Sequence, residues 1–144
     1  MTLLYKSRKL LWVLAAGLGL LGAQALQPAQ PEVQLTGEAA KLKAEGEKLY
    51  GQGCISCHGG EAQGGVGPAL SKNERLKDTR YVVQSLIKGV GYMHAVGLNL
   101  TDRELAAVIT FVRTSFGNTY EPVSEEEVMK LKAPPANGGW AKGM

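Results

Sequence analysis

The residues with the clearest chemical potential are two cysteines and a histidine in the segment Cys54-Ile55-Ser56-Cys57-His58. This C-x-x-C-H spacing is the attachment sequence of haem c. The two thiols can add across the two vinyl groups on one edge of the macrocycle, and the histidine next in the chain then falls beneath the iron. Both cysteines of the chain lie in this motif. The sequence therefore predicts one covalently bound haem c, attached at Cys54 and Cys57, with His58 as the proximal ligand of its iron.

Three other kinds of site use closely spaced cysteines: a disulfide, a thioredoxin-like redox pair and half of a zinc site. A thioredoxin-like pair belongs in a strand–helix–strand surrounding, and the sequence shows no strand pattern. Zinc would need two further Cys or His ligands, and His94 is the other histidine of the chain. Haem attachment is the favoured interpretation, with these three as alternatives.

The iron of a haem c takes Met or His opposite the proximal histidine. Three of the four methionines lie near the chain ends: Met1, Met129 and Met144. Met93 and its neighbour His94 are the remaining candidates for the sixth ligand. Adjacent side chains in a loop rarely point the same way, so we expect one of them to bind the iron and the other to lie elsewhere. An iron with an open or water-ligated sixth position is the third alternative.

The elements that must position these residues are predicted to be helical. A helical pattern covers residues 38–50, and residues 51–67, with seven glycines, are predicted to form a loop. Asp78 or Thr79 can cap a second helix that ends at Gly89. The apolar stripe expected on it is Val82, Val83, Leu86 and Ile87.

The best-specified element is the helix predicted from Thr101. Residues 101–104 (Thr-Asp-Arg-Glu) form a capping box, and Gly117 is the expected end of the helix, just after Phe116. A second box at residues 124–127 predicts a short helix near residues 128–131. We therefore expect a small all-α domain at residues 37–118, with three to four helices wrapped round a covalent haem c. Residues 119–144 are expected to form a C-terminal extension with a short helix and a disordered tail. The segment 118–131 either folds back over the domain or docks on a partner.

The front of the chain has the order of an export signal. Residues 1–9 are basic, residues 10–21 are apolar or glycine, and Ala23-Gln24-Ala25 provides a cleavage site. We expect cleavage after Ala25, which leaves residues 26–36 as a linker. The alternative is membrane attachment through residues 10–26, although 17 residues fall short of the ~20 that usually span a bilayer. Either way the domain is expected to be exported, to the periplasm or to the outer face of the cytoplasmic membrane.

Composition excludes several classes of protein. Hydrophobic residues make up 44% and charged residues 20%, which argues against a disordered chain and a polytopic membrane protein. The net charge of +3 comes from Lys6, Arg8 and Lys9, and the rest of the chain has 13 basic and 13 acidic residues. A neutral domain lacks the electrostatic basis for binding nucleic acid.

Residues 43–118 resemble a class I monohaem cytochrome c. The order of motifs is that of the family: Gly46, Tyr50, the C-x-x-C-H at 54–58, Gly67-Pro68-Ala69-Leu70, Gly91-Tyr92-Met93 and the capped last helix. The resemblance implies that His58 and Met93 are the axial ligands and that the Pro68 carbonyl accepts a hydrogen bond from the His58 ring. It also implies that Gly46 and Tyr50 pack against the last helix near Phe111. One departure is that the family usually has Pro after the ligand Met, where this chain has His94.

These observations predict electron transfer by a monohaem cytochrome that cycles between Fe(II) and Fe(III) and passes electrons between redox partner proteins, with no catalytic residue of its own. The alternatives are a haem c subunit permanently bound to a periplasmic dehydrogenase or reductase, and a ligand-binding or peroxidatic haem protein. Basic residues outnumber acidic ones five to two before Met93, in a stretch that could dock an acidic donor or acceptor or simply be solvated: Lys72, Arg75, Lys77, Arg80 and Lys88.

Overall fold

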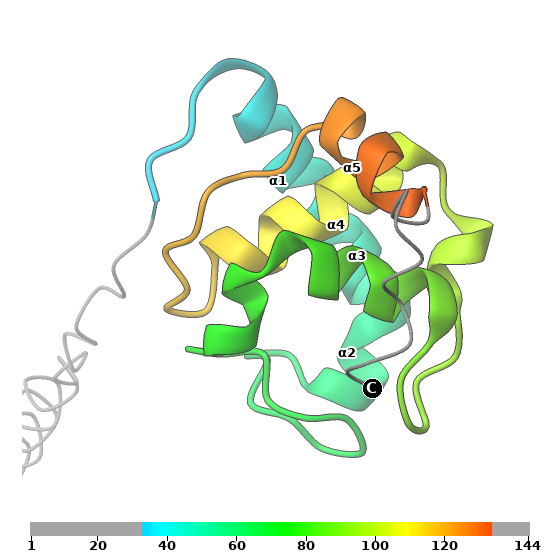
Figure 1. Ribbon diagram of the computed structural model, residues 1–144. Coiled ribbons are helices and arrows are strands. Elements are labelled where there is room, and N and C mark those ends of the chain that lie inside the picture. Colours follow the sequence, from blue (N-terminus) through cyan, green and yellow to red (C-terminus); the bar gives the residue numbers. More distant parts are fainter. Residues whose placement is uncertain (1–32, 134–144) are drawn as a thin grey trace, which may run out of the picture.

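The computed structural model describes residues 33–133, and the regular secondary structure of this part is helical (Figure 1). The α-helices are α1 (Gly37–Leu49), α2 (Ile55–His58), α3 (Thr79–Lys88), α4 (Asp102–Thr114) and α5 (Glu125–Lys132). Two short 3-10 helices lie at Glu74–Lys77 and Val96–Asn99. The all-α prediction is confirmed. The predicted signal, the first part of the linker and the predicted disordered tail beyond residue 133 lie outside the described residues. No helix within residues 33–133 is long and apolar enough to cross a membrane.

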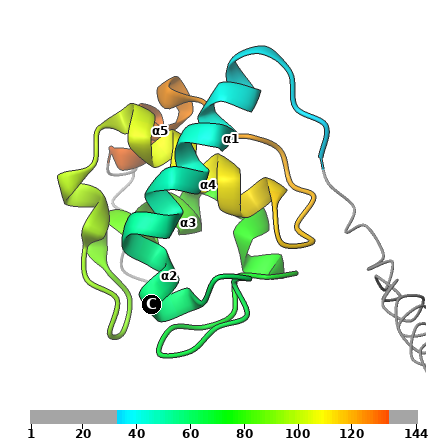
Figure 2. The ribbon, with the colours of Figure 1, turned by 180° about the vertical axis from the view of Figure 1, so that it is seen from behind.

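The core of the fold is the crossing of α1 over α4, the most extensive contact between two helices in the described part (Figure 2). Gly46 lies at this crossing, where a Cβ atom would overlap the Ala107 carbonyl and come within 2.8 Å of the Phe111 Cβ. The Tyr50 and Phe111 ring centroids are 5.5 Å apart. The expectation that Gly46 and Tyr50 pack near Phe111 is therefore confirmed. Only glycine lets the two backbones approach this closely.

The predicted helix starts are confirmed by their caps. The Asp78 side chain accepts a hydrogen bond from the Tyr81 amide at 3.0 Å, and α3 ends at Gly89 with a φ of +75°. Thr101 and Glu104 form the complete capping box that begins α4. This helix ends at Thr114, slightly earlier than predicted, because Ser115 is already extended, with φ −126° and ψ 176°, and Phe116 then takes a left-handed φ of +57°.

The predicted loop over residues 51–67 is wrong in its first part. The helical path continues from α1 through a π-type turn at Tyr50–Cys54 and into α2. The Ile55 amide donates to the Tyr50 carbonyl, five residues back, so the turn takes one extra residue without breaking the chain of hydrogen bonds. Glycine content misled the prediction because Gly51 and Gly53 are exposed residues of this turn.

The segment after α4 folds back over the domain and ends in α5, which packs on α3 and α4 (Figure 1). Val123 and Val128 are buried, and Thr110 exchanges two hydrogen bonds with the backbone of Val123, at 3.1 and 2.9 Å. The Gln84 side chain donates to the Leu131 carbonyl at 2.6 Å. Of the two possibilities that the sequence left open for this segment, the fold shows the first.

Candidate functional site

The two cysteines lie on consecutive turns of the helical path that leads into α2. Cys54 ends the π-type turn and is half-buried, while Cys57 is exposed within α2. The structure contains no disulfide between them. Burial, and secondarily the neighbouring Cys57, raise the pKa of the Cys54 thiol. Residues three apart on a helical path share one face, which lets both sulfurs meet the edge of a single flat group.

His58 is the last residue of α2, and its ring is 8% exposed. The ring Nδ1 lies 2.8 Å from the Pro68 carbonyl oxygen. A carbonyl can only accept a hydrogen bond, so Nδ1 is the donor in this contact, and in the neutral ring the lone pair is then on Nε2. The contact expected between His58 and Pro68 is therefore present, and it leaves Nε2 in the state that binds a metal.

The loop of residues 59–68 is tied back to the end of α2. The Gly64 amide donates to the His58 carbonyl at 2.8 Å, and the Gly67 amide donates to the Cys57 carbonyl at 2.9 Å. These carbonyls are among those that a helix end leaves without partners. A Cβ at Gly67 would lie 2.8 Å from the His58 Cε1 atom, so the backbone passes directly against the imidazole ring.

The Tyr50 hydroxyl also bonds to this loop, a contact that the sequence did not predict. Its ring packs between Phe111 and Phe116, and its hydroxyl donates to the Gly59 carbonyl at 2.7 Å. Burial, together with the charges of Cys54 and Glu61, raises the pKa of Tyr50 to about 12. The phenol therefore stays protonated and remains a donor at neutral pH. An aromatic residue predicted for packing gives no sequence signal of where its hydroxyl points.

Met93 directly follows a two-residue turn, Gly91 and Tyr92. The turn is closed by two backbone hydrogen bonds between Val90 and Met93, at 3.1 and 3.0 Å. Gly91 in this turn has a φ of +58°, and the neighbouring Tyr92 is 95% exposed. Met93 is half-buried, whereas His94 is exposed. Both views place this turn at the same end of the molecule as α2 and the loop that follows it (Figures 1 and 2). The two candidate ligands thus differ in environment, as expected for neighbours in a loop.

Most of the exposed large apolar side chains of the described part belong to the half of the domain that carries the site residues. Six of the seven lie within residues 55–98: Ile55, Val66, Val90, Tyr92, Val96 and Leu98. Ile55 and Val66 come from α2 and the loop after it, and Val90 and Tyr92 from the turn before Met93. Two thiols and an imidazole on segments that also expose apolar side chains fit a covalently bound haem.

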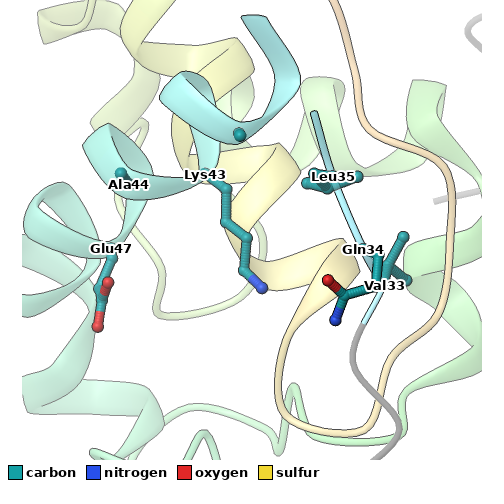
Figure 3. Close-up of a pocket in the computed structure, with 7 residues that line it drawn as sticks. Val33, Gln34, Leu35, Lys43, Ala44 and Glu47 are labelled. Atoms are coloured by element: carbon teal, nitrogen blue, oxygen red, sulfur yellow. The ribbon is translucent and has the colours of Figure 1, made fainter. Parts of the chain in front are cut away.

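Other features of the described residues do not compete with this site. A hollow of about 280 Å³ lies between the segment before α1 and α1 itself, with Lys43 extending across it (Figure 3). Its lining residues are Val33, Gln34, Leu35, Ala40, Lys43, Ala44 and Glu47, none of which belongs to the predicted site. Within residues 33–133 no three His, Cys, Asp or Glu side chains are grouped to hold a metal by themselves.

The five basic residues of the predicted stretch are exposed, from Lys72 before the 3-10 helix Glu74–Lys77 to Lys88 at the end of α3. The Arg75 guanidinium packs over the Tyr81 ring at 5.8 Å and donates to its hydroxyl at 3.4 Å. The five basic side chains are therefore on the surface, where a partner could meet them.

Comparison with known proteins gives two matches. The profile of the family described as "Cytochrome C oxidase, cbb3-type, subunit III" matches residues 41–112. A protein of Bacillus subtilis (strain 168) named cytochrome c-551 is 38% identical over 92 residues, which cover 62% of this chain and 79% of the relative. The family match covers the C-x-x-C-H segment, the loop after it and most of α4.

Proposed function

The chain belongs to the monohaem cytochrome c family, and on this premise we propose that it is an exported electron carrier between two redox proteins. Electron transfer is the activity that the family suggests, and haem c is the covalently bound group that it implies. When bound, this haem supplies an iron that changes between Fe(II) and Fe(III). The chain's own residues hold it, orient its ligands and limit the access of water.

The observation that carries the proposal is the His58 ring, buried at the end of α2 with Nδ1 bonded to Pro68. Cys54 and Cys57 would form the thioether links, and His58 Nε2 would be the proximal ligand. The Pro68 carbonyl fixes the tautomer and the plane of the imidazole and raises its basicity, as partners of metal-bound histidines do.

We assign the sixth position to Met93. Its half-buried side chain supports this choice over the exposed His94. A thioether favours ferrous iron and raises the reduction potential relative to an imidazole. The missing proline after Met93 leaves this turn dependent on the hydrogen bonds between Val90 and Met93.

The exposed basic residues on the segment 72–88 support docking of an acidic partner. Positive charge near a redox centre steers an oppositely charged protein and acts mainly on the rate of association. Neutralising Lys72 and Arg80 together should slow electron transfer with an acidic partner at low salt and leave the rate at high salt nearly unchanged.

A second candidate function is that of a haem c subunit in a larger oxidoreductase. The description of the matching family, which names an oxidase subunit, favours it. Because Val123 and Val128 are buried within the domain, a partner could meet the C-terminal segment only on its outer side, where Met129 is 50% exposed.

The deciding experiment is purification of the full chain from solubilised membranes and from the soluble fraction of the same cells. A carrier is expected as a monomer, whereas a subunit should co-purify with a larger redox chain. The mass of the mature protein tests export, since cleavage after Ala25 would leave Leu26 as the first residue. An intact N-terminus in the membrane fraction would replace cleavage by anchoring.

A further inference from the structure

The Tyr50 side chain connects the contact between α1 and α4 with the loop that follows His58. Its ring is 3% exposed and belongs to an aromatic cluster with Phe111 and Phe116, whose centroids lie 5.5 and 5.3 Å from it. Its hydroxyl bonds to the carbonyl of Gly59, the residue directly after His58. One side chain therefore connects the rigid contact between α1 and α4 with the first residue of the loop.

Backbone hydrogen bonds connect Gly59 with the rest of the loop. The Gly59 carbonyl also accepts from the Ala62 amide at 3.1 Å, and the fully buried Ala62 has a left-handed φ of +52°. The Ala62 carbonyl in turn accepts from the amides of Leu70 and Ser71, at 2.8 and 3.0 Å. Pro68 lies between these bonded residues, so its carbonyl is connected to Gly59 through two successive steps of backbone hydrogen bonds.

We propose that Tyr50 is a positioning residue whose hydroxyl, through the Gly59 carbonyl, sets the hydrogen bond between Pro68 and the His58 ring and thereby the reduction potential. The proposal rests on the proposed function, in which His58 binds the haem iron. A firmly placed acceptor makes the imidazole a stronger donor, which favours ferric iron and lowers the potential. Without the hydroxyl the Gly59 carbonyl loses its link to the aromatic cluster, and the loop moves more freely against His58.

The test uses the full-length, haem-loaded chain with Tyr50→Phe, which removes the hydroxyl and keeps the ring in its cluster. Tyr120→Phe is the matched control, because it removes a hydroxyl from a half-buried ring that belongs to neither ligand segment and packs against Arg113. We expect Tyr50→Phe to raise the reduction potential and to speed amide exchange at Gly64 and Gly67 about tenfold, the factor that corresponds to loss of one hydrogen bond. Tyr120→Phe should leave both quantities at their wild-type values.

Two results would overturn the proposal. The first is Tyr50→Phe that lowers the free energy of unfolding but leaves the potential unchanged, which would make the hydroxyl merely structural. The second is a raised potential with unchanged exchange at Gly64 and Gly67, since the loop would then not carry the effect. Failure of the proposed function is seen separately, in a His58→Ala protein that keeps the wild-type absorption spectrum of the haem.

Discussion

The backbone around His58 and the turn around Met93 are held in different ways. The helix end at His58 is bonded on several sides, by the Pro68 carbonyl, by the amides of the following loop and, through Gly59, by the Tyr50 hydroxyl. The Met93 turn is closed by its own hydrogen bonds with Val90, and its tip is exposed at Tyr92. The histidine side is thus bonded into the domain, whereas the methionine side is bonded mainly to itself.

This difference indicates that the two proposed ligands have different roles. The hydrogen bond to Pro68 and the bonds between the loop and the end of α2 hold the His58 ring in one orientation. A turn that is bonded locally can shift against the core at little cost, because local unfolding is least costly where backbone groups are exposed and contacts few. We therefore expect replacement of Met93 itself to have the larger effect on spectrum and potential, and changes that disturb the packing around His58 to have the larger effect on stability.

The largest expected effect comes from the double variant Cys54→Ala with Cys57→Ala. Removing both thiols removes both thioether links, so the haem colour of the denatured protein on a reducing gel should be lost completely. The haem-loaded wild type should keep its colour under the same conditions. A colourless wild-type band from cells that mature c-type cytochromes would contradict the attachment at this motif.

The next effect, confined to the methionine side, is expected for Met93→Ala. This variant should keep its covalent haem but lose the weak sulfur-to-iron band at the red end of the oxidised spectrum, and its potential should fall. His94→Ala is the matched control and should keep both. The opposite pattern, with Met93→Ala silent and His94→Ala altered, would assign the sixth ligand to His94. Carbon monoxide binding to the reduced wild type would instead indicate an open site.

A smaller effect, on the histidine side, is expected for Gly67→Ala. The added methyl would meet the His58 ring, so we expect a loss of about 1–3 kcal/mol in the free energy of unfolding, as for other overpacked sites. Denaturant titration of the haem-loaded protein measures it. Gly51→Ala is the control, because a Cβ there meets no atom within 4 Å in the described structure. Equal stability of the two variants would show that the loop does not hold the ring tightly.

The smallest effect is expected for His94→Pro, which stiffens the Met93 turn. Proline limits the unfolded chain, and a compatible site gains about 0.4–1 kcal/mol in the free energy of unfolding. The residue before it, Met93, is in a bridge with Val90, an extended conformation that suits the position before proline. Thermal unfolding measures the gain. A loss of stability or of the sulfur-to-iron band would mean that the His94 backbone needs the freedom that proline removes.

Local sequence signals predicted the helices with marked ends. The caps at Asp78 and Thr101 and the stop at Gly89 involve residues within a few positions of one another, so their interactions can be inferred without the fold. The glycines at 51 and 53 carried a weaker signal, because glycine is common both in loops and in irregular helical turns. There the prediction was wrong, and the continuous path from α1 into α2 decided the local conformation.

The hydrogen-bond partners of the buried polar residues could not be predicted from the sequence. Arg113 on α4 is 4% exposed, and its guanidinium donates to the carbonyls of Leu76, Lys77 and Glu121. Asn118 bonds to the backbone of Asn73, Leu70 and Val112. Their partners are mostly main-chain groups, which every residue has, so residue types alone do not reveal them.

The sequence by itself determined the haem attachment motif, the class of fold and the two candidates for the sixth ligand, because each depends on residue type and short spacing. Only the tertiary structure decided that the Tyr50 hydroxyl reaches Gly59, that Gly67 passes against the His58 ring and that the C-terminal segment covers α3 and α4. These contacts depend on how the loop after α2 folds back and on how the C-terminal segment packs against two helices, which residue type and short spacing do not reveal. Their geometry exists only once the helices have packed.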